Sequence, residues 1–175
     1  MPFSYYQRLT PRQQRTYRAS DAVAAVPIPA AAELRPLAAA LEASLREDRR
    51  LEVERASRAL AGELCRQLCV PPVRVRVLAA RPSSSYGELH GLYDPEIPPP
   101  LVTLWMRTAA KRRVVAYKSF LRTLVHELLH HLDYELFRFD ESFHTEGFFQ
   151  RESSIARQLL GTEQSPAGPE RPSGR

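Results

Sequence analysis

Cysteine is scarce in this chain of 175 residues, which contains only Cys65 and Cys69. These two residues stand four positions apart in a stretch that we expect to be helical. They are too few for a disulfide framework or a zinc ribbon, so we predict reduced, mostly buried thiols. Because no second cysteine pair exists to complete a tetrahedral site, we do not expect this pair to hold a metal.

The chain also lacks an apolar run of membrane length, and its first residues contain no apolar segment of a signal peptide. Residues 22–32 are rich in alanine, but Pro27 and Pro29 interrupt them, so we interpret them as a connector. These absences predict a cytoplasmic protein without membrane association.

Histidine occurs five times, and two of these residues belong to the sequence HELLH at positions 126–130. Residues 117–136 contain no Gly or Pro, and their apolar residues recur at helical spacing, which predicts a helix. Residues i and i+4 share a helix face, so His126 and His130 can bind one ion while Glu127 flanks it. Imidazole suits zinc, and Glu127 would take the proton of a zinc-activated water as general base. We predict one Zn²⁺ per chain.

A third metal ligand must come from elsewhere in the chain. The polar residues 139–143 can reverse the chain, which places His144 at the start of a second helix that returns beside the first. We predict His144 as the third ligand, with Glu146 and Glu152 as alternatives of the gluzincin kind. A metzincin is excluded, because the chain does not continue as HExxHxxGxxH.

Local signals predict the other elements. Thr10, Pro11 and Gln13 mark the capped start of a short helix, and residues 33–68 form one broken helix or two packed helices. Residues 73–78, 88–94 and 101–107 have strand patterns, and residues 81–85 form a loop. We divide the chain into a basic N-terminal extension (1–32), a single domain (33–161) and a disordered tail (162–175). The order of helices, three short strands, metal helix and return helix indicates an α+β fold.

These residues together resemble the SprT-like group of zincin metallopeptidases. The shared features are the HExxH motif on a long helix, a short acidic loop, and His144 followed four residues later by Phe148. Residues 88–94 and 101–107 resemble the strand pair that precedes the metal helix in that group. The resemblance covers about residues 70–160 and implies a zincin-like fold with zinc-dependent endopeptidase activity. Many members also carry a cysteine-rich zinc ribbon, which this chain lacks.

A peptide or protein substrate could pair with an edge strand of the small sheet. We expect residues 88–94 to form that edge, with residues 101–107 as the second choice. Tyr93, His90 and Tyr134 are candidate donors for stabilising the transition state, and the sequence does not choose among them. Asp133 could orient a histidine, guard the cleft or lie on the helix surface.

Basic residues gather in two stretches of the chain. Residues 97–126 contain six and residues 1–18 contain four, without an acidic residue in either. Such a face can attract nucleic acid, although the formal net charge of +5 is modest. Two alternatives to a peptidase stay open: a DNA-associated or other binding module with a structural metal, and a zinc hydrolase acting on a non-peptide bond. Glu127, which is no ligand in a three-histidine site, favours an enzyme.

Overall fold

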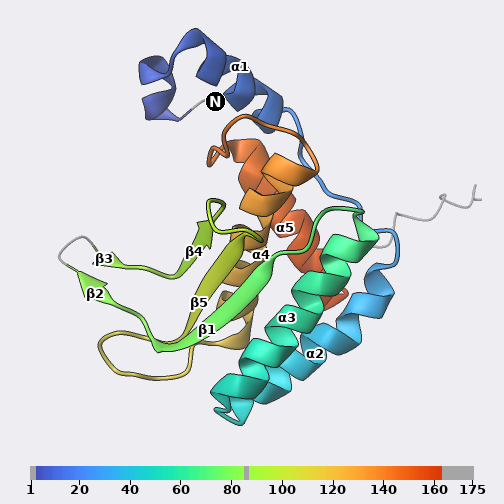
Figure 1. Cartoon of the computed structure of the whole chain (residues 1–175), viewed down its shortest axis with the longest axis vertical. Helices are drawn as coiled ribbons and strands as arrows, with labels where there is room; N and C mark the ends of the chain where they lie inside the picture. Colours follow the sequence, from blue (N-terminus) through green and yellow to red (C-terminus); the bar gives the residue numbers. More distant parts are fainter. Residues whose placement is uncertain (1–2, 85–86, 163–175) are drawn as a thin grey trace, which may run out of the picture.

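Five α-helices and a small mixed sheet form most of residues 3–84 and 87–162, which the computed structural model describes. This arrangement confirms the predicted α+β class (Figure 1). The helices are α1 (Pro11–Asp21), α2 (Ala31–Arg46), α3 (Arg50–Gln67), α4 (Tyr117–Glu135) and α5 (Glu146–Leu160), preceded by a 3-10 helix, η1 (Ser4–Arg8). Of the predicted C-terminal tail, only Thr162 belongs to the described residues.

The sheet contains β1 (Arg74–Ala80), β4 (Gly91–Asp94) and β5 (Leu101–Arg107), in the order β1-β5-β4. β5 pairs in parallel with β1 and antiparallel with β4, so it lies in the middle of the sheet. Our second choice for a peptide-binding edge, residues 101–107, is therefore wrong, because both sides of that strand are occupied. β4, by contrast, is an outer strand.

The strand predicted at residues 88–94 is divided in two. Its first residue belongs to β3 (Gly87–Glu88), which pairs with β2 (Ser83–Ser84) in a separate ribbon. Pairing with β5 begins only at Gly91. The predicted loop at residues 81–85 thus contains β2, because a two-residue strand is too short to produce an alternating pattern.

Side chains of α3 cover the outer edge of β1. Arg58 Nε donates to the backbone oxygen of Val75 at 2.8 Å, and Arg50 donates to that of Val77 at 2.9 Å. The backbone N–H of Val77 donates to Glu54 Oε2 at 2.9 Å. Three backbone groups at this edge are therefore already bonded within the chain.

The predicted helix signals are confirmed. The side chain of Thr10 accepts a hydrogen bond from the backbone of Gln13, and the Gln13 side chain accepts one from the backbone of Thr10. Helix α1 runs to Asp21. Residues 33–68 form two packed helices, α2 and α3.

The two cysteines differ from each other in their surroundings. Cys65 is buried on α3, and burial raises the pKa of its thiol to about 11. Cys69 is exposed and lies beyond the end of α3, with a φ of 55°. The expectation that both thiols are buried on one helix is therefore wrong for Cys69, because the chain turns there before Pro71.

Helix α4 lies at the centre of the fold, where it contacts β4, β5, α2 and α5. Seven of its apolar side chains join the buried core: Phe120, Leu121, Leu124, Val125, Leu128, Leu129 and Leu132. In Figure 1, η1 and α1 (blue) lie at the top, beside the orange segment that joins α4 to α5. Within residues 3–84 and 87–162, none of the helices combines the length and the apolar character that crossing a bilayer requires.

Candidate metal centre

Three histidine side chains meet beside helix α4. His126 and His130 lie one turn apart on α4, and His144 comes from the loop before α5. Nε2 of His144 lies 3.0 Å from Nε2 of His126 and 3.1 Å from Nε2 of His130. A ligand atom from each histidine lies within 4.8 Å of the others, which is close enough to hold one metal ion.

The start of α5 determines where His144 lies. Thr145 is the N-cap of this helix, and its side chain accepts a hydrogen bond from the backbone N–H of Phe148 at 2.9 Å. The prediction that His144 stands at the start of this helix is therefore wrong, because the residue lies just outside it. Phe148 is fully buried, and its ring centroid lies 5.0, 5.0 and 5.1 Å from those of the three imidazoles. Its ring thus forms an apolar backing for the cluster.

The far nitrogens of two histidines are held by hydrogen-bond acceptors. Nδ1 of His126 lies 3.0 Å from Oε2 of Glu152. Nδ1 of His130 lies 2.7 Å from Oγ of Ser142. Ser142 donates its single hydroxyl proton to Asp133 Oδ2 at 2.7 Å, so its oxygen must accept from His130. Both imidazoles then carry their proton on Nδ1, and the lone pairs of Nε2 face the centre of the cluster.

Burial favours the neutral forms of His130 and His144. It lowers the pKa of His130 to about 3, with a further contribution from the charges of His126 and His144. Burial also lowers the pKa of His144, and His126 adds to the effect. A neutral His144 has at most one proton on Nε2 and cannot donate it fully to both neighbours. At least one of the two contacts between Nε2 atoms, which are 3.0 and 3.1 Å long, therefore has no proton between its nitrogens. Two lone pairs face each other there, and a bound cation would remove their repulsion.

The two glutamates that we considered as alternative ligands do not join the cluster. Glu146 is exposed on the first turn of α5. Glu152 is buried behind His126, and its Oε1 accepts hydrogen bonds of 2.9 and 3.1 Å from Arg122. Burial would raise the pKa of Glu152, but the hydrogen bonds from His126 and Arg122 outweigh it and lower the pKa. Glu152 is thus an ionised partner of His126.

A buried ion pair lies behind His130. Oδ1 of Asp133 accepts a hydrogen bond from Arg151 at 2.9 Å, and both side chains are fully buried. Burial raises the pKa of Asp133, against the opposing effect of Arg151 and Ser142. Of the three roles that the sequence left open for Asp133, the structure favours the first: it orients His130 through Ser142.

Glu127 lies between the histidines and the outer strand β4. The residue is only 7 % exposed, and burial raises the pKa of its carboxyl to about 7. The backbone N–H of Tyr93 donates a hydrogen bond to this carboxylate. Gly91 makes room for the carboxylate, because a Cβ on residue 91 would lie 2.5 Å from Oε1 of Glu127. Gly91 is therefore a site residue, although the sequence did not single it out.

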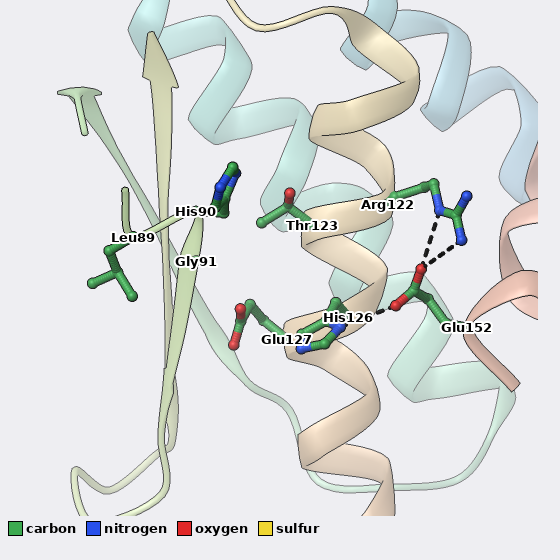
Figure 2. A pocket seen from close by; sticks show the side chains of 8 residues that line it. All are labelled: Leu89, His90, Gly91, Arg122, Thr123, His126, Glu127 and Glu152. Carbon is green, nitrogen blue, oxygen red and sulfur yellow. Dashed lines mark hydrogen bonds and ion pairs between the residues drawn. The ribbon is translucent and has the colours of Figure 1, made fainter. Parts of the chain in front are cut away.

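Two surface cavities meet at His126, Glu127 and Gly91. The first has a volume of about 380 Å³ and is also lined by Leu89, His90, Arg122, Thr123 and Glu152. The second has a volume of about 360 Å³ and is also lined by Leu92, Tyr93, Pro95, His130, Tyr134, Ser142 and His144. Figure 2 shows Glu127 pointing from α4 toward β4, while Arg122 and His126 both reach Glu152. The two cavities together follow β4 past Glu127.

The chain was also compared with known proteins. No protein-family model, curated protein or solved structure matches it. The resemblance to the SprT-like group therefore stays a prediction that rests on the HExxH motif and on the spacing to His144.

The three candidate donors for the transition state are placed differently. Nε2 of His131 donates to the backbone oxygen of Pro71 at 2.8 Å, so its Nδ1 accepts the hydroxyl proton of Tyr93 at 3.1 Å. The hydroxyl proton of Tyr93 is thus not free for a substrate. His90 is exposed and lines the first cavity. Tyr134 lines the second cavity, one turn beyond the HExxH motif on α4.

Proposed function

We propose that this protein is a zinc-dependent metallopeptidase of the SprT-like zincin type, with Glu127 as the general base. The observation that carries the proposal is the meeting of three imidazole nitrogens beside a buried carboxylate. A structural metal site would need the histidines but would give no reason for a buried Glu127 that is not one of the ligands.

The set of donor atoms suits zinc. Catalytic zinc sites use three protein ligands and keep one position open, and His126, His130 and His144 would supply those ligands. The hydrogen bonds on Nδ1 of His126 and His130 fix the tautomer that presents Nε2, as partners of metal-binding histidines do. When bound, zinc lowers the pKa of water to about 7 and polarises a carbonyl group.

Glu127 is placed to move the protons of peptide hydrolysis. Its carboxylate would accept a proton from the water that attacks the scissile carbonyl carbon and would return it to the departing amine. The backbone N–H of Tyr93 keeps the carboxylate in place during this exchange. Among the candidate oxyanion donors we favour Tyr134, which lines the second cavity together with the three histidines. Tyr93 donates its hydroxyl proton to His131, and His90 lines the first cavity.

An extended peptide is the substrate class that the sheet favours. β4 is an outer strand, and both cavities follow it beside the histidines. A peptide in extended conformation can pair with such a strand through backbone hydrogen bonds. The opposite outer strand, β1, is covered by side chains of α3. The peptide would therefore pair with β4.

Nucleic acid as a partner, a non-peptide substrate and a cytoplasmic location also stay predictions. Lys111, Arg112 and Arg113 are exposed after β5, which favours a basic surface there. Two other basic residues of this stretch are instead paired with acidic side chains, since Arg107 binds Asp48 and Arg122 binds Glu152. These pairs reduce the charge available to a nucleic acid.

Metal analysis of the purified protein tests the centre. We expect one zinc per chain, and we expect His144→Ala to release zinc most readily because it removes a ligand. Glu152→Ala removes no ligand, but it removes the partner of His126 and Arg122, so it should weaken zinc binding by about 10- to 100-fold. Glu146→Ala is the control and should bind zinc like the unmodified chain. A greater loss in Glu152→Ala than in His144→Ala would identify Glu152 as the ligand, and a second tightly held zinc would contradict the single site.

A further inference from the structure

Residues 3–23 form an N-terminal strap, comprising η1, α1 and the residues around them, which packs against the loop that carries His144 (Figure 1). We propose that this strap is a positioning element of the metal centre: it holds residues 139–144, the His144 loop, and thereby raises the affinity for metal. The proposal rests on the metal centre proposed above. It gives a role to a segment that lies outside the HExxH motif and its return helix.

The strap binds the His144 loop directly. The hydroxyl of Tyr5 donates a hydrogen bond to the backbone oxygen of His144 at 3.0 Å. Nε of Arg12 lies 2.9 Å from Oδ2 of Asp140, at the other end of the loop. Tyr17 is only 1 % exposed, and its ring packs against those of Tyr5 and Tyr6 within the strap. The ring centroids of Tyr17 and Phe143 lie 6.1 Å apart. The strap thus contacts the loop near its beginning, at Asp140, and at its end, at Phe143 and His144.

The end of α1 is fixed against the start of α5. The backbone N–H of Gly147 donates to Asp21 Oδ1 at 3.1 Å. A Cβ on Gly147 would lie only 2.5 Å from the backbone oxygen of Asp21, so the two backbones are in close contact. Oγ of Ser20 lies 3.3 Å from Oγ1 of Thr145, the residue after His144. The strap is therefore held in place on both sides of the histidine.

Arg151 connects the strap to the residues behind His130. Its guanidinium donates to the backbone oxygen of Ser20 at 2.5 Å and to that of Val23 at 2.7 Å. The same guanidinium donates to Asp133, which orients His130 through a serine. Two of the three histidines thus depend on groups that the strap contacts.

Beyond the strap, side chains of two residues tie the His144 loop to the fold: Ser142 bonds to Asp133 and His130, and the ring of Phe139 stacks on Phe137. In the described part of the chain, its hydrogen bonds between backbone groups run from Phe139 N–H to Asp133 O and from Thr145 N–H to Phe143 O. The two histidines on α4, by contrast, are held by a helix in the core. A ligand on a loose loop loses conformational freedom when the metal binds, and this loss weakens binding. Contacts that order the loop beforehand therefore raise the affinity.

The double variant Tyr5→Phe/Arg12→Ala tests the proposal in the full chain. It removes one hydrogen bond and one exposed ion pair to the loop without replacing a ligand or Glu127. We expect the zinc dissociation constant, measured by competition with a chelator, to rise about tenfold. Cobalt bound in place of zinc should show an altered visible absorption spectrum, since that absorption reports the ligand geometry.

The matched control is Tyr6→Phe/Arg8→Ala, which removes the same chemical groups from the same segment. The hydroxyl of Tyr6 bonds to Arg18 within the strap, and Arg8 is exposed. The control should bind zinc within about twofold of the unmodified chain. The two double variants should also unfold at similar urea concentrations in the metal-free state, which separates positioning from general stability.

A charge exchange gives an independent check. Arg12→Asp and Asp140→Arg should each weaken zinc binding, and the combination of both should restore it, because the ion pair is rebuilt in reverse. Equal zinc affinity in the test and control double variants would overturn the proposal. An unmodified chain that binds no zinc would overturn the metal centre and the strap's role together. Zinc binding that depends on the strap, but without peptide hydrolysis, would overturn only the peptidase.

Discussion

The two outer strands of the sheet differ in what lies along their free edges. Along β1, side chains of α3 bind the backbone groups at residues 75 and 77. Along β4 lie two cavities and the carboxylate of Glu127, which interacts with the backbone of Tyr93. An exposed strand edge can pair with other chains, so proteins commonly cover it. This protein covers the edge away from the histidines and leaves the edge beside them accessible.

This difference predicts a separation of effects between the two edges. Substitutions beside β4 should change turnover and leave stability almost unchanged, because the groups there face a cavity. Substitutions beside β1 should lower stability and leave turnover unchanged, because the groups there satisfy backbone hydrogen bonds.

Glu127→Gln should have the largest effect of these substitutions. The amide keeps the shape of the carboxylate but cannot accept a proton, so we expect turnover to fall by at least about 10²- to 10⁴-fold. Hydrolysis of an unfolded protein substrate measures turnover, and metal analysis should show an unchanged zinc content. Equal turnover in the variant would mean that the histidine cluster is structural.

Gly91→Ala should have the next largest effect on turnover. The added Cβ would lie 2.5 Å from Oε1 of Glu127 and would displace that carboxylate. A misplacement of about 1 Å can lower turnover by about a hundredfold, whereas the flexible side chain can move at little cost in stability. The control is Gly62→Ala on α3, where a Cβ meets no other atom within 4 Å. This control should keep full turnover and raise the free energy of unfolding by about 0.5–1 kcal/mol. Similar turnover in both variants would argue against a general base at Glu127, beside Gly91.

Glu54→Ala should have the smallest effect on turnover and a clear effect on stability. It removes the acceptor of the Val77 N–H and the partner of two arginines. We expect the free energy of unfolding, measured in urea, to fall by about 1–2 kcal/mol. The control Glu52→Ala removes only an exposed pair with Arg55, so its cost should stay below about 0.5 kcal/mol. A loss of turnover without a loss of stability in Glu54→Ala would remove the distinction between the edges.

Much of the histidine cluster could be predicted because it depends on local geometry. Helical spacing places His126 and His130 on one face, and residues 139–143 are long enough to bring His144 back toward them. The strand pattern of β1 and the capping box of α1 are equally local, and both are present. The length of β4 was not predictable in this way, because residue 88 pairs with β2 instead of β5.

The groups behind the histidines could not be predicted from the sequence. Ser142 and Arg151 look like an ordinary loop serine and a surface arginine until the fold brings Asp133 between them. Glu152 has the residue type and spacing of a ligand, and only its contacts with His126 and Arg122 distinguish a partner from a ligand. A buried arginine of this kind leaves no periodic signal, because its partners come from other elements of the fold.

The long reach of Arg151 has a consequence for the order in which the protein folds. Its hydrogen bonds to the strap join residues 131 and 128 positions apart, and the bond from Tyr5 to His144 spans 139 positions. Contacts between such distant residues form slowly, because a long loop must close before they are made. Helices α2, α3 and α4 can form from nearby residues, so they should appear early in refolding. The capacity to bind zinc tightly should appear after the helical circular dichroism signal, and the delay between the two would measure how late the strap docks.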